Sequence, residues 1–403
     1  MEIATEIETR TSRWPLTRLD IAGAFGDVGV LFPIAIALIS LNGMNPTAVF
    51  LAAGLAYILA GAYFRIPIAV QPLKAVAAIA LALNLPPSSI AAAGLVMGVV
   101  LCVIGITNLA PLLARLFTLP IVRGIQLGLG LLLARGGIHL ILESKGASAA
   151  ASALPTSSVF IALGAAGVLL AFRKSRRFPA ALILLGAGLL LGIAAHWQAL
   201  PSLDLGPLPF DILHPSAGLL WSALIVLVVP QFALTFGNAI VATENTAEIL
   251  YGPQAHRVTT RALSLSIGVM NLCAGAIQAA PMCHGSGGIT AHNKFGGRSE
   301  KSSYIIGAVC LFLALFGHSA LGLLGLIPMT VLGVFLIYVG IQHGSFVRDI
   351  VKNRVWLFIA VVVGLIALAT TNLTYGFLVG FALQGLHLAY LKLRARRDLS
   401  AAR

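Results

Sequence analysis

The chain has 403 residues, of which 59% are hydrophobic and only 10% are charged. Because soluble domains carry roughly 25% charged residues, this composition excludes an ordinary soluble protein. Long apolar runs recur from end to end, which predicts a helical protein that crosses a membrane several times. The formal net charge of +13 comes from basic residues in short loops beside these runs, a pattern typical of membrane proteins that requires no nucleic-acid partner.

Fourteen apolar segments follow one another along the chain. In chain order they cover residues 24–41, 46–64, 67–84, 88–110, 119–141, 156–172, 178–196, 218–243, 262–279, 284–293, 302–317, 319–342, 354–370 and 373–391. The third and the tenth each contain Pro near the start and polar residues in the middle. The tenth is also too short to cross about 30 Å of hydrocarbon as a helix. We expect both to be half-spans, that is, helices that begin midway through the bilayer.

The connections between the segments differ in charge. If the N-terminus is cytoplasmic, Lys and Arg gather in the inside connections, as in residues 173–177 and 392–397, whereas the outside connections hold only Lys145. This asymmetry predicts that both termini are cytoplasmic. The N-terminal stretch has no small-residue cleavage site, so we do not expect a removable signal peptide. The short tails fit a bacterial inner membrane.

The two halves of the chain resemble each other. "AFGD" (24–27) in the first segment matches "TFGN" (235–238) in the eighth. The stretch "LPIVRGIQLGLG" from Leu119 also resembles "IPMTVLGVFLIYVG" from Ile327, and each has Pro as its second residue. Seven spans per half is an odd number, so the halves lie in opposite orientations, which is typical of transporters whose interrupted helices hold the substrate. We therefore predict an all-α polytopic membrane protein with a seven-plus-seven inverted-repeat fold. Its parts are a cytoplasmic tail over 1–20, a first repeat over 21–196, an extracytoplasmic linker over 197–217, a second repeat over 218–391 and a basic cytoplasmic tail over 392–403.

The two predicted half-spans contain the residues that we expect to bind a ligand. In "RIPIAVQPLKAVAA" (65–78), Pro72 is well placed as the first residue of a helix. In "APMCHGSGGITAHNKFGGR" (280–298), Pro281 has the same role, and glycines follow that let backbone N–H groups approach a ligand. These glycines are Gly285, Gly287 and Gly288. Two helix N-termini facing each other present free N–H donors and two positive dipole ends, an arrangement that selects an anion.

Lys74 strengthens the prediction of an anion site. A Lys within an apolar segment costs a few kcal/mol at the bilayer centre, so it should face a cavity or a partner. It lies in the first turn after Pro72, beside the predicted anion; the alternative is an ion pair with Asp27 or Glu244. Gln71 and Ser286 offer neutral hydrogen bonds to an oxyanion.

Other polar residues have two interpretations each. Asp27 and Asn238 occupy matching places in the repeat, where they either line the cavity from unbroken spans or cross-link helices. Glu244 is the candidate for proton coupling, because protonation of a desolvated carboxylate and binding of a dianion favour each other. Alternatively, Glu244 is a charged residue at the edge of the membrane without a role in transport. Arg135, deep in the fifth segment, is a weaker site candidate that can also snorkel.

Cys283 and His284 are adjacent, but two or three ligands without a partner cluster make a poor metal site, so we predict no metal. His284 is better explained as an anion donor or a proton relay, and His292 as a packing residue. The sequence contains no nucleotide-binding loop, nucleophile elbow or zinc-protease motif. We therefore predict neither an enzyme nor a cofactor, and transport driven by an ion gradient or by exchange.

"PIAVQPLKAVAA" and "PMCHGSGGITAHNKFGGR" resemble the two signature motifs of the molybdate transporter family, distant relatives of the SulP sulfate permeases. The resemblance extends from about Gly23 to Tyr390. It implies molybdate uptake and a fold in which spans 1–4 and 8–11 form a core and the other spans form a gate. The anion site that it implies consists of Gln71, Lys74, His284, Gly285, Ser286, Gly287 and Gly288, with Pro72 and Cys283 at its edge.

The chain departs from the family pattern at His292, where Gln is usual, and at Ser286, where Ala or Gly is usual, so the resemblance fixes the class of substrate better than its selectivity. Sulfate, tungstate or another oxyanion is the main alternative, and a nucleobase is disfavoured because Lys74 suits a dianion. Homodimers are common among relatives. The sulfate permeases often carry a cytoplasmic STAS domain, which the short segment after the last span does not lead us to expect. An anion channel is a further alternative, and it would be recognised by conductance without a saturable flux.

Overall fold

The computed structural model describes residues 16–109, 118–143, 155–172, 180–201, 204 and 206–401. The helices and strands are, in chain order, α1 (Arg18–Ala24), α2 (Val28–Asn42), α3 (Pro46–Phe64), β1 (Gln71–Pro72), α4 (Lys74–Leu83), α5 (Pro87–Thr107), α7 (Leu119–Glu143), α8 (Pro155–Phe172), α9 (Ala180–Ala195), η1 (Trp197–Ala199), α10 (Ala217–Ala223), η2 (Leu224–Val228), α11 (Val229–Leu234), η3 (Thr235–Val241), α12 (Ala242–Tyr251), η4 (Gly252–Arg257), α13 (Thr260–Ala276), β2 (Met282–Cys283), α14 (Ser286–Lys294), α15 (Lys301–Ala314), α16 (Gly317–Leu324), α17 (Met329–Ser345), η5 (Phe346–Ile350), α18 (Arg354–Thr370) and α19 (Leu373–Ala401).

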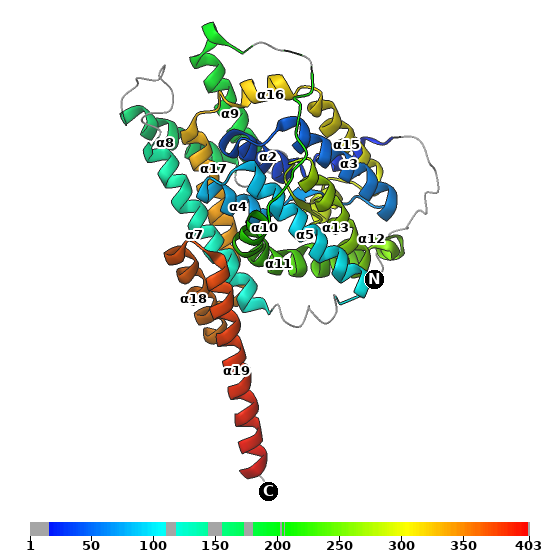
Figure 1. Cartoon of the computed structure of the whole chain (residues 1–403), viewed down its shortest axis with the longest axis vertical. Helices are drawn as coiled ribbons and strands as arrows, with labels where there is room; N and C mark the ends of the chain where they lie inside the picture. Colours follow the sequence, from blue (N-terminus) through cyan, green and yellow to red (C-terminus); the bar gives the residue numbers. More distant parts are fainter. Residues whose placement is uncertain are drawn as a thin grey trace, which may run out of the picture.

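Within the described residues, seven helical segments are long and apolar enough to cross a membrane, counting α1 with α2 and the continuous stretch from α10 to η4 each as one. A further candidate, α15 with α16, is bent by 84°. The prediction of a helical, multi-pass membrane protein is thus confirmed. The predicted N-terminal tail lies mostly outside the described residues. Residues 392–401 of the predicted C-terminal tail continue α19 as helix, which projects beyond the body of the molecule (Figure 1).

Two expectations about individual spans are wrong. The predicted span 319–342 is two helices, because α16 ends at Leu324 and α17 begins only at Met329, after Pro328 in an extended conformation at the N-cap. The first span is also not an unbroken helix. α1 ends at Ala24, and α2 begins at Val28 with Asp27 as its N-cap.

Both copies of the repeated motif therefore depart from regular α-helix. "AFGD" falls at the break between α1 and α2, and "TFGN" falls within η3, a π-helical segment. A Cβ at Gly26 would lie 2.8 Å from backbone atoms of Ala291, so glycine allows the break to approach α14 closely. π-helical turns often occur at functional sites, which makes η3 a candidate part of the site.

Helix packing follows a two-fold relation between the halves. In the predicted repeat α3 corresponds to α13, and α5 corresponds to α15. The structure packs α3 against α15 and α5 against α13, so exchanging the halves converts each pair into the other. α7 packs against its own counterpart α17, and β1 pairs with β2. This is the packing expected of an inverted repeat.

Glycines bring α7 and α17 into close contact. A Cβ at Gly130 would lie 2.5 Å from the carbonyl oxygen of Gly340, and one at Gly137 would lie 2.4 Å from that of Gly333. Such small residues allow the backbones of two membrane helices to approach each other. In Figure 1 these helices lie on one side of the molecule with α8, whereas α3, α5, α13 and α15 lie on the other, with α4 between the two groups.

Candidate functional site

Two short strands bring the predicted half-spans together. β1 and β2 are antiparallel, with Gln71 opposite Cys283 and Pro72 opposite Met282. The N–H of Leu73 extends this pairing by donating to the carbonyl oxygen of Pro281 at 2.8 Å. α4 begins two residues after β1, and α14 begins three residues after β2. The prediction that Pro72 and Pro281 are the first residues of these helices is wrong, because Pro72 lies in β1 and Pro281 precedes β2. Two short helices far apart in sequence thus start side by side, and their placement midway through the bilayer stays a prediction.

Polar side chains of the neighbouring helices hold these extended segments. Asn271 of α13 accepts from the N–H of Met282 at 2.7 Å and donates to its carbonyl oxygen at 2.7 Å. Ser303 of α15 makes the corresponding pair of bonds with Ile68, at 3.1 and 3.2 Å. Because extended backbone inside a bundle has no helical partners for its polar groups, these bonds stabilise it where a membrane would supply no water.

The first turn of α14 is accessible and retains free donors. Gly287 is exposed, Ser286 is partly exposed, and a Cβ at Gly287 would meet no atom within 4 Å. The N–H groups of Gly288 and Ile289 donate to the carbonyl oxygen of Gly285, at 3.0 and 3.1 Å. Among the described residues no acceptor lies opposite the N–H groups of Ser286 and Gly287. This turn therefore offers the open helix N-terminus that an anion needs.

The matching motif in η3 lies against the same turn. The Ser286 hydroxyl donates to the side-chain oxygen of Asn238 at 2.9 Å, and Asn238 is itself partly exposed. This bond leaves the Asn238 amide nitrogen available as a donor. Asn238 and α14 together form a polar, accessible surface.

Asp27 lies behind this surface and is fully buried. Its two carboxylate oxygens accept from the Tyr57 hydroxyl, at 2.5 Å, and from the side-chain amide of Gln71. A Cβ at Gly288 would lie 2.9 Å from Asp27 Oδ1 and 2.2 Å from the Cβ of Ala69. Asp27 therefore cross-links α2, α3 and β1, and Gly288 allows α14 to pack directly on this linkage.

The N-terminus of α4 differs from the prediction of free donors. The side-chain oxygen of Gln231, in α11, accepts from the N–H groups of Ala75 at 2.7 Å and Val76 at 3.2 Å. Its amide nitrogen donates to the Thr235 hydroxyl at 2.9 Å. Sequence reasoning missed Gln231; the available signal was an isolated Gln in an apolar span, one turn before "TFGN".

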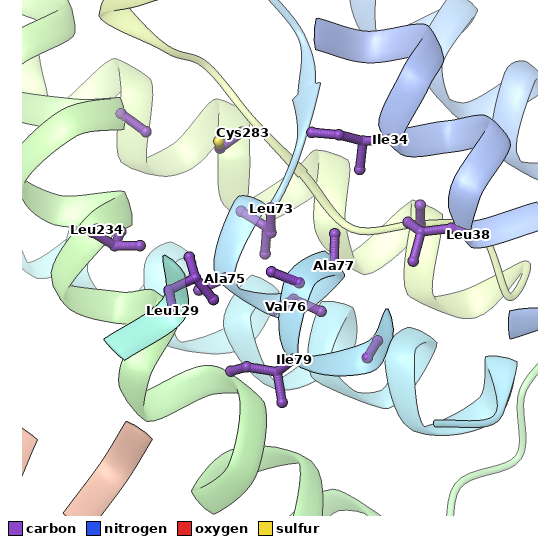
Figure 2. Packing of buried hydrophobic residues seen from close by; sticks show 14 of the residues in the cluster. Ile34, Leu38, Leu73, Ala75, Val76, Ala77, Ile79, Leu129, Leu234 and Cys283 are labelled. Carbon is purple, nitrogen blue, oxygen red and sulfur yellow. The ribbon is translucent and has the colours of Figure 1, made fainter. Parts of the chain in front are cut away.

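α4 is otherwise enclosed by apolar side chains. Figure 2 shows Leu73, Val76 and Ile79 surrounded by residues of α2, α7 and α11. The labelled neighbours are Ile34, Leu38, Leu129 and Leu234, and Cys283 lies near the start of the helix. Cys283 is buried and belongs to this packing, and Pro72 is buried in β1.

Lys74, the first residue of α4, places a positive charge next to these apolar side chains. Its side chain is partly buried and lines a small cavity, with room for about one water, between α2, α4, α7 and α17. The other lining residues include Ile34, Leu133, Phe335 and His343. Within the described part of the chain Lys74 has no ion pair, so the alternative pairing with Asp27 or Glu244 is not what the structure shows.

His284 is buried and uses both ring nitrogens. Nδ1 lies 2.8 Å from the carbonyl oxygen of Ala69, and Nε2 lies 2.9 Å from the Ser266 hydroxyl. A carbonyl oxygen only accepts, so Nδ1 carries the proton and Nε2 accepts from Ser266. This arrangement holds the two extended segments together, and a direct role toward an anion requires one of the bonds to be exchanged. His292 is also buried, with Nδ1 2.7 Å from the carbonyl oxygen of Gly23.

Glu244 and Arg135 lie apart from the two helix starts. Glu244 Oε2 accepts from the N–H of Thr260 at 3.1 Å, and thus caps the first turn of α13. Arg135 is exposed on α7 and is not among the residues that line the cavity beside Lys74. Arg123, which lies near the start of the same helix, forms an ion pair with Asp349 at 2.5 Å.

The structure thus brings Gln71, Asp27, Asn238 and the "HGSGG" turn around the starts of α4 and α14, with Lys74 on the side that faces α7 and α17.

Comparison with known proteins identifies relatives over nearly the whole chain. A family model described as "Molybdate transporter of MFS superfamily" matches residues 20–133 and 223–342, which are corresponding parts of the two halves. "Molybdate transporter 2" of Arabidopsis thaliana is 29% identical over 94% of this chain and 87% of its own length. "Molybdate transporter 1" of Chlamydomonas reinhardtii is 27% identical over 93% and 92% respectively.

Solved structures show the same fold at low sequence identity. The transmembrane domain of the cyanobacterial bicarbonate transporter BicA aligns with a TM-score of 0.66 and 16% identity, covering 90% of this chain and 96% of that domain. The murine solute carrier 26 family member A9, an anion transporter, aligns with a TM-score of 0.67 and 15% identity over 94% of this chain and 70% of its own. The inverted-repeat fold predicted from the sequence is therefore confirmed.

Proposed function

This chain belongs to the molybdate transporter family, and from that premise we propose that it takes up molybdate as a secondary transporter with the dianion bound between the first turns of α4 and α14. Membership makes it an integral, multi-pass membrane protein that transports an oxyanion, and not an enzyme. In the proposed site Lys74 supplies the counter-charge. The hydrogen-bond donors are the N–H groups of Ser286 and Gly287 and the Asn238 amide, whose oxygen accepts from the Ser286 hydroxyl.

The observation that carries this proposal is the unpaired charge of Lys74. A cation enclosed by apolar side chains is costly without a counter-ion, and among the described residues none is present. A mobile dianion bound beside the open turn of α14 would supply one. Helix N-termini and an ammonium group are both complementary to a tetrahedral oxyanion.

The position of Lys74 also fits alternating access. It lies where α4 of the proposed core meets α7 and α17 of the proposed gate. Movement of the core, spans 1–4 and 8–11, against the gate would open the site first to one side of the membrane and then to the other. The domain boundaries and the cytoplasmic placement of both termini stay predictions, as does assembly into a dimer.

Oxyanion binding to the purified protein tests the substrate. We expect saturable binding of molybdate that survives a large excess of sulfate, and tungstate should compete because its charge and shape are the same. Chloride at the same ionic strength serves as the control for screening. Equal displacement by sulfate would indicate a general oxyanion carrier, and binding of neither anion would contradict the proposal.

Replacing Glu244 by Gln tests proton coupling. Gln still accepts from the Thr260 N–H, so the cap on α13 is kept while the titratable group is lost. If Glu244 carries the coupled proton, uptake by the variant should lose its dependence on a pH gradient but still exchange internal for external molybdate. Transport assays in proteoliposomes measure both. An unchanged response to the pH gradient would limit Glu244 to its structural role.

A further inference from the structure

The capping of α4 by Gln231 places an internal acceptor where the proposed function requires an anion. Gln231 is 2% exposed, and its side-chain oxygen accepts from two backbone N–H groups of the first turn of α4. The cap comes from a different helix, 156 residues away in sequence. The residue that precedes the helix, Leu73, makes no side-chain cap.

We propose that Gln231 is a displaceable cap: its oxygen holds the donors of Ala75 and Val76 in the empty site, and a bound oxyanion takes them over. This inference rests on the proposed function. Without a ligand, two N–H groups inside a membrane protein would lack partners, which is unfavourable. A neutral amide oxygen satisfies them, but a dianion is the stronger acceptor because hydrogen bonds to charged groups are roughly twice as strong.

The side-chain nitrogen of Gln231 can also donate a hydrogen bond to the anion that displaces its oxygen. Its nitrogen now donates to the Thr235 hydroxyl, at 2.9 Å, and Thr235 is fully buried at the start of η3. After displacement from α4, rotation of the side chain directs this N–H₂ group toward the anion. One residue thereby acts as acceptor in the empty site and as donor in the occupied site. Competition by the cap disfavours weakly accepting monoanions and so contributes to selectivity.

Two substitutions separate this role from a merely structural one. Gln231→Glu keeps the acceptor geometry, but a carboxylate at a helix N-terminus is held more tightly and repels a dianion. We expect molybdate affinity to fall at least 100-fold while the melting temperature of the empty protein stays equal or rises. Gln231→Met removes the acceptor at similar volume. The empty protein should melt at a lower temperature, and saturating molybdate should raise that temperature by more than in the wild type.

Gln384, a buried glutamine of α19, is the matched control. Its Glu and Met variants change the same chemistry in the membrane region but should leave molybdate affinity within threefold of the wild type. Molybdate titration and thermal unfolding in detergent measure all four variants. Affinity within threefold of wild type for Gln231→Glu, or an unchanged molybdate-induced shift for Gln231→Met, overturns the displaceable cap alone. A wild-type protein that binds no oxyanion overturns the proposed function and, with it, this inference.

Discussion

Lys74→Ala should abolish high-affinity molybdate uptake while leaving the protein folded in the membrane. Removing one member of a buried charge pair costs about 2–5 kcal/mol, which corresponds to a loss of affinity of roughly 30- to 4,000-fold. The fold should tolerate the change because Lys74 makes no ion pair within the described residues and because Ala suits the first turn of a helix. Uptake of labelled molybdate at concentrations near the wild-type KM measures the loss.

The control for this experiment is Lys352→Ala. Lys352 is exposed in the connection between η5 and α18, so its removal changes the net charge equally without touching α4. Its uptake should match that of the wild type. Membrane abundance of both variants must be compared, since poor insertion would imitate a lost site. Normal uptake by Lys74→Ala would exclude Lys74 as the counter-charge of the substrate.

Gly288→Ala and Gly287→Ala should fail in different ways. A Cβ at position 288 would lie 2.2 Å from the Cβ of Ala69 and 2.7 Å from the Gln71 amide nitrogen, so the start of α14 would have to move away from β1. Overpacking of this kind typically costs 1–3 kcal/mol, occasionally more. We expect a lower melting temperature, less folded protein in the membrane and no measurable uptake.

A methyl group at position 287 meets no atom within 4 Å, so Gly287→Ala should fold as well as the wild type. It should nevertheless weaken molybdate binding at least tenfold, because the methyl group occupies the space beside the free N–H groups of α14. Gly164→Ala, in a helix position that is equally open, is the control and should be neutral. Thermal unfolding and binding titration distinguish the two effects. Full binding by Gly287→Ala would place the anion elsewhere.

The interruptions before α4 and α14 were predictable because their residues are exceptional in an apolar chain. Pro72 and Lys74 interrupt one segment, and the run from Pro281 to Gly288 interrupts another; the structure starts α4 at Lys74 and α14 at Ser286. The matching of the two halves was visible for the same reason. Local composition is sufficient where Pro, Gly and a charge leave few conformations open.

Contacts between distant segments were not predictable in this way. Nothing in the sequence near Gln231 indicates that its side chain caps a helix 156 residues earlier, because the pairing depends on how α11 packs on α4. The bonds of Asp27 to Tyr57 and Gln71 have the same origin. The break at residues 325–328 was hidden because Gly and Pro are common within membrane helices. A single sequence shows which residues are exceptional, but their partners follow from the fold.

The pairing of β1 with β2 bears on the thermodynamics of uptake. The two strands, the bond from Leu73 to Pro281 and the clamp by Asn271 fasten the starts of α4 and α14 into one rigid unit. Cargo held between them would travel with that unit and keep the same contacts on either side of the membrane. The contribution of these contacts to the binding affinity would then be nearly equal at both faces. Net accumulation would be set by the coupled gradient, and without one the protein would only equilibrate its substrate between the two sides.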